Sequence, residues 1–245
     1  MATFNGERYL AEQVTSILSE LGPDDELVVV EDCSTDSTPA LLRSFGDPRI
    51  KVYDNDRNRG VNYSFGRALS VATGGVIFMS DQDDRWIAGR VRAFIDVLRN
   101  TGALVASSNS AFMDGEGKQI AFPIEGVRAA DASRHFTNIV GIFTGRTVYY
   151  GCAMAMRKRL LDLVLPIPAF VESHDLWIAM AGNLIGANAH LEQETLWRRV
   201  HGGNASIVRR SLARKLWSRV IFGVSLIHLT WRALKHRGRG WTAQA

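Results

Sequence analysis

The sequence predicts an α/β fold with a mostly parallel sheet flanked by helices, and three observations lead to this prediction. Short apolar runs alternate with helical patterns through the first half of the chain, which is typical of βαβ units. The runs are bounded by Gly and polar residues, as expected of strands covered on both faces. The 245 residues, 46% of them hydrophobic, suffice to bury one medium-sized core.

The elements of the first half follow one another in a regular order. The first expected helix covers 7–19, with apolar residues on one face, and Gly22-Pro23 ends it. A buried strand over 26–30 leads into the polar residues 34–38, which offer N-cap side chains to a helix over 39–45. The remaining elements of this half are a strand over 50–53, a helix over 62–72, a strand over 76–80, a helix over 88–99 and a strand over 104–107.

The second half has a looser pattern. We expect a turn at 114–117, a strand over 147–156, and a helix over 158–163 that Pro166-Ile167-Pro168 terminates. Another helix is expected over 174–185. We find no internal repeat, low-complexity tract or convincing linker before the tail.

The composition disfavours several classes of protein. The chain is too apolar for disorder, Cys33 and Cys152 are too few for a disulfide scaffold, and we expect no signal segment. A reducing cytoplasm is therefore the expected compartment. The net charge of +4 is unevenly placed, because no acidic residue follows Glu194 while Arg and Lys continue to Arg239.

The residues most informative about function are Asp81, Asp83 and Asp84, which follow the apolar run 75–80. Ligand sites in open α/β sheets lie beyond the carboxyl ends of the strands, so these carboxylates stand where a ligand would bind. Oxygen ligands suit Mg²⁺ or Mn²⁺, which in turn suit a diphosphate. The alternative is a solvated Asp-rich loop that caps the helix beginning near Trp86.

Several motifs occur together in a characteristic order and spacing. They are Ala2-Thr3-Phe4-Asn5-Gly6-Glu7-Arg8-Tyr9-Leu10, Glu31-Asp32-Cys33-Ser34-Thr35-Asp36, Asn58-Arg59-Gly60-Val61, Ser80-Asp81-Gln82-Asp83-Asp84, Gly151-Cys152-Ala153-Met154, Pro166-Ile167-Pro168, His174-Asp175-Leu176-Trp177 and His201-Gly202-Gly203-Asn204. Over roughly residues 1–206 the chain resembles a family 2 glycosyltransferase with the GT-A fold, and is most similar to the bacterial rhamnosyltransferase-type members. Each motif alone is weak, so the resemblance depends on their occurring in register.

The resemblance implies a site for a pyrimidine-diphosphate sugar, a UDP- or dTDP-sugar. The donor-binding positions of the family correspond here to Thr3, Phe4, Asn5, Glu7, Asp32, Arg59, Gly60 and Asp81. Asp32 would accept the pyrimidine N3–H, and Phe4 would stack on that ring. Arg59 and Gly60 would approach the phosphates. In the alternative interpretation Asp32 is a turn or capping residue, Phe4 belongs to the core, and the Asn-Arg-Gly motif is an ordinary turn.

The resemblance also implies a metal site and a catalytic base. Asp81, Asp83 and His201 would hold Mg²⁺ or Mn²⁺, which neutralises the departing nucleoside diphosphate. Asp175 would take the proton of the acceptor hydroxyl, and a base on the far side of the sugar implies single displacement with inversion. The alternatives are a surface histidine in a Gly-rich turn at His201 and a helix-capping carboxylate at Asp175.

Residues 1–205 are therefore expected to form the glycosyltransferase domain, with a nucleotide-sugar-binding half over 1–110 and an acceptor-binding half over 111–205. The expected reaction is inverting transfer of a sugar, with rhamnose as a candidate, to a polysaccharide or lipid-linked acceptor in cell-surface glycan synthesis. The alternative is a catalytically inactive nucleotide-sugar-binding module, or a truncated fragment, on the same fold. A nucleic-acid partner is not expected, because the chain resembles no duplex-reading or single-strand-stacking module.

The start of the chain departs from the family pattern. Family members begin with an apolar strand before the Ala-Thr-Phe-Asn motif, and here only Met1 represents it. Because such a strand lies inside the sheet, its loss would leave backbone groups of its neighbours without partners. We expect a fragment with a misassigned start rather than a damaged copy, and low solubility or weak donor affinity for the chain as written.

The expected tail over 206–245 combines basic pairs with an apolar segment over 216–231. It is too short and too charged to span a bilayer, which takes about 20 mostly apolar residues. One interpretation is a basic amphipathic helix lying peripherally on the inner face of the plasma membrane, with Trp217 and Trp231 at the interface. The other is a helix packed on the catalytic domain with its basic face in water.

Overall fold

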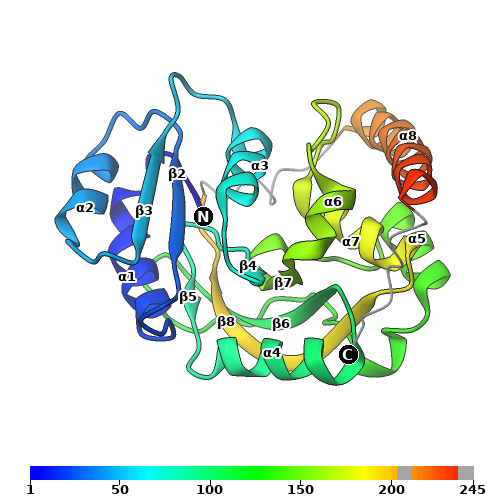
Figure 1. Ribbon diagram of the computed structural model, residues 1–245, viewed down its shortest axis with the longest axis horizontal. Coiled ribbons are helices and arrows are strands. Elements are labelled where there is room, and N and C mark those ends of the chain that lie inside the picture. Colours follow the sequence, from blue (N-terminus) through cyan, green and yellow to red (C-terminus); the bar gives the residue numbers. More distant parts are fainter. Residues whose placement is uncertain (203–210, 237–245) are drawn as a thin grey trace.

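The computed structural model describes residues 1–202 and 211–236, and strands alternate with helices through its first half (Figure 1). This half contains β1 (Ala2–Thr3), α1 (Glu7–Leu18), β2 (Leu27–Glu31), α2 (Thr38–Ser44), β3 (Ile50–Asp54), α3 (Val61–Val71), β4 (Val76–Phe78), β5 (Arg85–Trp86), α4 (Arg90–Thr101) and β6 (Val105–Met113). The second half contains η1 (Ala129–Asp131), α5 (His135–Thr144), η2 (Gly151–Ala153), β7 (Met154–Arg157), η3 (Lys158–Leu160), α6 (Leu161–Val164), α7 (His174–Leu184), β8 (Asn188–Arg199) and α8 (Leu212–Lys235), where η marks a 3-10 turn.

The strands form two sheets. In the first, β1, β2 and β3 are parallel, with β2 in the middle. The second has the order β4-β7-β6-β8-β5, in which β6 and β8 run parallel while β7 and β5 are antiparallel to their neighbours. In Figure 1, α4 covers one side of β6 and β8, and α6 and α7 lie on the other. The predicted α/β class, with parallel strands flanked by helices, is confirmed.

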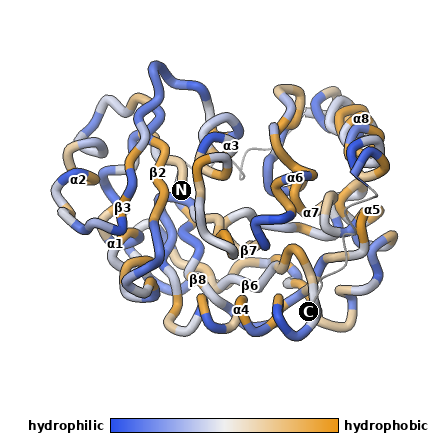
Figure 2. Tube along the Cα trace, viewed as in Figure 1, coloured by the Kyte–Doolittle hydropathy of each residue, from blue (hydrophilic) through white to orange (hydrophobic). Residues whose placement is uncertain are grey.

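The main core lies where the second sheet meets the second-half helices. Trp177 of α7 is fully buried, and its Nε1 donates a hydrogen bond to the carbonyl of Val164 at 3.0 Å. Leu229 of α8 is buried in the same cluster, so α8 packs on the rest of the fold, as one of the two interpretations of the tail expected. In the first sheet, all five residues of β2 are buried, and Figure 2 colours most of this strand as hydrophobic. None of the helices within 1–202 and 211–236 has the length and apolar character needed to cross a bilayer.

A cavity of about 310 Å³ lies between β2 and β4, which belong to different sheets. Its lining is mostly apolar and includes Met1, Val28, Phe65 and Ile77. Next to β2, only the two residues of β1 continue the sheet towards this cavity. In the described part of the chain, β4 pairs with β7 alone, so its other edge faces the cavity.

The sequence prediction is wrong in several segments of the second half. The strand expected over 147–156 exists only from Met154 onwards, because 151–153 form a 3-10 turn. The prediction also lacks α5 and β8 and ends β6 six residues too early. Of the expected tail, 211–236 are described and are mostly helical, while Arg209-Arg210 lies outside the described residues, as does Gly203-Asn204 of the last motif.

Candidate active site

The aspartate loop after β4 is held in place from two sides. Gln13 of α1 is buried and donates from Nε2 to Ser80 Oγ at 2.7 Å and to the Asp81 carbonyl at 2.9 Å. Gln82 forms a reciprocal pair with Phe4, whose N–H donates to Gln82 Oε1 at 2.9 Å and whose carbonyl accepts from Nε2 at 3.0 Å. The loop that carries the aspartates is thereby fixed against the loop that follows β1.

The aspartates crowd one another in a poorly solvated place. Asp84 is 2% exposed, and burial together with the charges of Asp81 and Asp83 raises its pKa to about 8. Burial and then Asp83 raise the pKa of Asp81 as well. Asp84 Oδ1 accepts from the Arg199 N–H at 3.0 Å, whereas its buried Oδ2 has no hydrogen-bond partner among the described residues. A bound cation would relieve this repulsion.

His201 lies beside the aspartate loop, as the resemblance implies. Its Nε2 is 2.8 Å from Asp83 Oδ2, and its ring centroid is 5.0 Å from that of Tyr9. The pairing follows from β8, whose carboxyl end is fastened to the loop because Arg199 Nε donates to the Asp83 carbonyl at 2.9 Å. The structure thus brings His201 and Asp83 together through a strand that was not predicted from the sequence.

The donor atoms at this loop fit a divalent cation. Carboxylate oxygens suit Mg²⁺ and Mn²⁺, and an added imidazole favours Mn²⁺. The structure also groups three possible ligand atoms within 4.8 Å of one another, one each from Asp81, Asp84 and Cys152. This group differs from the metal ligands predicted from the sequence, which are Asp81, Asp83 and His201. Burial raises the pKa of the Cys152 thiol well above its usual value, so this softer group is a weak ligand for either ion. The carboxylates of Asp81 and Asp83 with His201 remain the better candidate set.

Asp175 faces the same site from the start of α7. Its Oδ1 accepts from the Leu176 N–H at 2.7 Å and from the Ser173 hydroxyl, and its Oδ2 accepts from the Gly151 N–H at 3.3 Å. Burial raises its pKa, although the amides at a helix N-terminus oppose this. The charge of Asp175 in turn contributes to the raised pKa of Asp81, so the two carboxylates share one electrostatic environment.

Arg198 is a candidate residue of this site that was not predicted from the sequence. It is buried, with its guanidinium carbon 3.8 Å from the centroid of the Tyr150 ring. Its charge opposes the effect of burial on both Asp81 and Asp175. The Arg198-Arg199 pair just before His201 was the available signal, but the alternation along β8 decides that Arg198 lies over Tyr150 while Arg199 binds the backbone of the aspartate loop.

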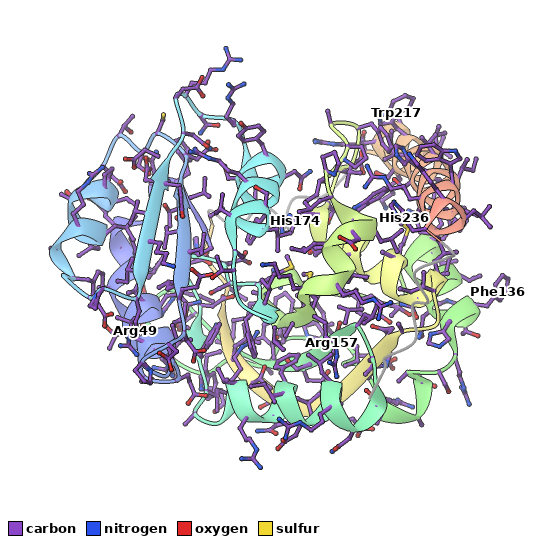
Figure 3. All side chains as sticks on the ribbon, viewed as in Figure 1. Arg49, Phe136, Arg157, His174, Trp217 and His236 are labelled. Atoms are coloured by element: carbon purple, nitrogen blue, oxygen red, sulfur yellow. The ribbon has the colours of Figure 1, made fainter. Side chains whose placement is uncertain are left out.

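His174, which Figure 3 labels near the middle of the molecule, is a neutral structural partner of this site. Its ring stacks on Phe65 with centroids 4.1 Å apart, and both its N–H and its Nδ1 lie 3.1 Å from Asn62 Oδ1. Burial lowers its pKa to about 4 despite the nearby charge of Asp81. The imidazole is therefore uncharged at neutral pH.

The expected donor residues meet at the carboxyl end of β2, but several serve the local fold. Asp32 is buried and accepts from the N–H groups of Arg59 and Gly60, both at 2.8 Å, and from Asn55 Nδ2 at 2.6 Å. The Arg59 guanidinium binds Asp56 at 2.9 Å. These contacts give the turn interpretation of this motif direct local support.

In the loop after β1, too, some of the expected donor-binding residues hold the local fold. Phe4 is 43% exposed and so is not a core residue, whereas Thr3 is buried. Asn5 Oδ1 accepts from the Thr35 N–H at 2.8 Å, and Glu7 Oε2 accepts from the Ser37 N–H at 2.8 Å. Asn5 and Glu7 therefore fix the loop after β2.

A second cavity, of about 190 Å³, lies beside the segment that leads to Gly151, whose amide binds Asp175. Its lining includes Tyr149 and Tyr150, which directly precede the Gly151 amide that binds Asp175, and the exposed carboxylates of Glu192 and Glu194. Buried Ser107 also lines it, and its hydroxyl has no partner among the described residues. This cavity is polar, unlike the apolar one between β2 and β4.

Comparisons with known proteins show the family of the chain. The family described as "Glycosyl transferase family 2" matches residues 1–165. The chain is 32% identical over 120 residues to the succinoglycan biosynthesis protein ExoO of Rhizobium meliloti (strain 1021), which covers 49% of this chain and 34% of ExoO. It is 30% identical over 115 residues to the UDP-Glc:alpha-D-GlcNAc-diphosphoundecaprenol beta-1,3-glucosyltransferase WfgD of Escherichia coli, which covers 47% of this chain and 43% of WfgD. The matched regions thus span less than half the length of these two relatives.

The fold has a solved counterpart. The crystal structure of S. aureus TarS 1–349 in complex with UDP-GlcNAc superposes with a TM-score of 0.66 at 18% identity. The match covers 96% of this chain and 71% of that one. At this identity the likeness concerns the fold, which is the GT-A arrangement expected from the sequence.

Proposed function

The chain belongs to glycosyl transferase family 2, and from this premise we propose that it is an inverting, metal-dependent glycosyltransferase of cell-surface glycan synthesis. The proposed donor is a UDP- or dTDP-sugar, with dTDP-rhamnose as one candidate. The proposed acceptor is a hydroxyl group of a polysaccharide or lipid-linked glycan. The relatives support this choice, since WfgD is named for a UDP-Glc donor and a diphosphoundecaprenol acceptor, and ExoO for succinoglycan biosynthesis.

The observation that carries the proposal is the meeting of carboxylates from distant segments. Asp81 and Asp83 follow β4, His201 follows β8 and contacts Asp83, and Asp175 begins α7 within the electrostatic reach of Asp81. A purely structural ion pair would explain the contact between His201 and Asp83 alone. Crowded carboxylates at the carboxyl end of a strand, with the pKa of Asp81 and of Asp175 raised, are instead typical of a functional site.

The chemistry assigned to Asp175 is general-base catalysis. The acceptor oxygen bonds to the anomeric carbon, the bond from that carbon to the phosphate oxygen breaks, and its electron pair leaves with the nucleoside diphosphate. The proton of the acceptor hydroxyl passes to Asp175. A base works best when its pKa lies near the working pH, so the raised pKa of Asp175 suits this role. Its Oδ2 accepts the long bond from the Gly151 N–H at 3.3 Å, and a carboxylate oxygen has a second lone pair that can take the proton.

We assign the cation to Asp81 and Asp83 with His201. When bound, Mg²⁺ or Mn²⁺ would neutralise negative charge on the leaving diphosphate. The chain itself adds Arg198, a buried cation near the same aspartates that would attract the diphosphate. Exposed Phe4 remains the proposed stacking partner of the base, and Asp32 the proposed acceptor from its N3–H.

The polar cavity beside the segment that leads to Gly151 is the proposed acceptor site. The carboxylates of Glu192 and Glu194 accept hydrogen bonds only, so the lining suits a molecule rich in hydroxyl groups. Tyr150 gives a flat ring on which a sugar can rest, held from its other side by Arg198.

The proposal is tested by turnover of a nucleotide-sugar panel combined with a binding assay. We expect Asp175→Asn to bind UDP as the wild type does and to lose at least about 100-fold in turnover, the usual range for loss of a general base. Asp96→Asn, on the exposed side of α4, is the matched control and should change neither. Unchanged turnover in Asp175→Asn would refute the base assignment. Wild-type protein that binds nucleotides but turns over no donor would instead indicate the inactive binding module.

A further inference from the structure

Helix α8 carries an apolar stripe that faces solvent. The exposed apolar residues of this helix begin with Leu216 and then recur every three or four positions, at Trp217, Val220, Val224, Ile227, Trp231 and Leu234. Such spacing places side chains on one side of a helix. From Leu216 to Leu234 the stripe is about 27 Å long, at 1.5 Å per residue. Ile227, near its middle, is 72% exposed.

The opposite side of α8 is the one that packs on the domain. Ser225, Leu229 and Arg232 are buried there, and Arg232 donates to the Leu163 carbonyl at 3.0 Å and to the Pro166 carbonyl at 2.8 Å. A helix on the surface of a globular protein normally has one apolar side, which faces the core. Helix α8 has a second apolar side, the exposed stripe from Leu216 to Leu234, which is available for another contact.

Helix α5 extends the exposed apolar surface. Phe136, Val140 and Phe143 are exposed at a spacing of four and three residues, and Phe136 is 79% exposed. The Phe143 ring lies 5.3 Å from that of Phe222 on α8, so the two helices join at this point. Figure 1 shows α5 beside α8, and Figure 3 shows Trp217 and Phe136 at the outer edge of the molecule. We call the exposed apolar residues of α5 and α8 together the docking face.

The charges of α8 indicate what the docking face contacts. The helix has no acidic residue and contains Arg214, Lys215, Arg219 and Lys235 in addition to buried Arg232. Tryptophans lie near both ends of the stripe, and indole rings favour the boundary between water and lipid. A surface that binds a protein usually has polar groups placed among its apolar side chains to pair with the partner. Apolar side chains bordered by cations instead match the headgroup region of an anionic bilayer.

We propose that α5 and α8 dock the protein on an anionic lipid bilayer, with the apolar stripe in the headgroup region and the basic residues at the lipid phosphates. This attachment is peripheral and goes beyond the proposed reaction. It would hold the acceptor cavity near lipid-linked substrates.

The test is co-sedimentation of the full chain with vesicles. We expect binding to vesicles of phosphatidylcholine and phosphatidylglycerol at 3:1, and at least tenfold weaker binding to phosphatidylcholine alone or in 0.5 M NaCl. The variant Trp217→Glu/Ile227→Glu/Trp231→Glu should bind the anionic vesicles at least tenfold more weakly and keep its melting temperature, since all three side chains are exposed. The matched control is Val61→Glu/Tyr63→Glu, at comparably exposed positions of α3, which should bind as the wild type does.

Two results would overturn the proposal. One is equal vesicle binding by the wild type and the triple variant. The other is absence of vesicle binding together with a concentration-dependent dimer in light scattering that the triple variant abolishes, which would make the docking face an interface between two copies of the chain.

Discussion

Replacing Asp84 by Asn should stabilise the metal-free protein by an amount that grows as the pH rises from 5 to 7. In the folded protein, burial and the neighbouring Asp81 and Asp83 raise the pKa of Asp84 to about 8, so it stays protonated across this range. In the unfolded chain the same carboxyl ionises near about pH 3.9. Asn keeps the acceptor for the Arg199 N–H and carries no charge in either state.

The size of the effect follows from this difference in pKa. Because the folded pKa is the higher one, the contribution of Asp84 to stability is complete below about pH 4 and is lost as the pH rises towards 8. Each pH unit within that window corresponds to about 1.4 kcal/mol, so the loss between pH 5 and 7 is about 3 kcal/mol. For a chain of this size that corresponds to about 5–10 °C in melting temperature.

The assay is thermal unfolding in EDTA at pH 5, 6 and 7. The melting temperature of the wild type should fall by about 5–10 °C more than that of Asp84→Asn over this range. Asp24→Asn, at an exposed position, is the control and should follow the wild type. Parallel curves for the wild type and Asp84→Asn would show that Asp84 is not held protonated among its neighbours, which would refute the crowding argument.

Three further predictions concern the fold. Cys33 has a positive φ of 62° that few residues other than Gly adopt readily, so Cys33→Gly should stabilise the protein by about 1 kcal/mol in urea unfolding, and a lower midpoint would contradict this. A Cβ at Gly182 would collide with the Val105 side chain, so Gly182→Ala should destabilise by about 1–3 kcal/mol, and an unchanged midpoint would show that α7 and β6 adjust freely. Four Val or Ile residues added before Met1 should fill the cavity between β2 and β4 and raise the melting temperature; a Gly/Ser extension that raised it equally would argue against cavity filling.

The elements around the donor half could be predicted because their patterns are local. The apolar face of α1, with Leu10, Val14 and Ile17 buried, recurs at helical spacing, and the apolar run before Asp81 marks a strand and the end at which ligands bind. Strand β8 could not be found in this way, because exposed Glu192, Gln193 and Glu194 interrupt its apolar pattern. Its partner β6 is far away in the sequence, so their pairing is a tertiary contact.

In the candidate site, too, the contacts between side chains that are distant in the sequence could not be predicted from local patterns. The motifs pointed to these residues, yet the hydrogen bonds of Asp32 to Arg59 and Gly60 depend on a turn 27 and 28 residues away. Likewise, the register of β8 brings the Arg198 guanidinium over the Tyr150 ring and the Arg199 guanidinium to Glu12 and the Asp83 carbonyl, which two adjacent arginines in a sequence do not reveal. Residue types are legible from the sequence, whereas their partners require the fold.

The central claim, that the carboxylates after β4 hold a cation against a nucleoside diphosphate, is tested most directly by titrating UDP into the protein with and without Mn²⁺ in a calorimeter. We predict that Mn²⁺ tightens UDP binding at least tenfold in the wild type and has no such effect in Asp83→Asn. Equal UDP affinity in the wild type with and without Mn²⁺ would contradict the claim.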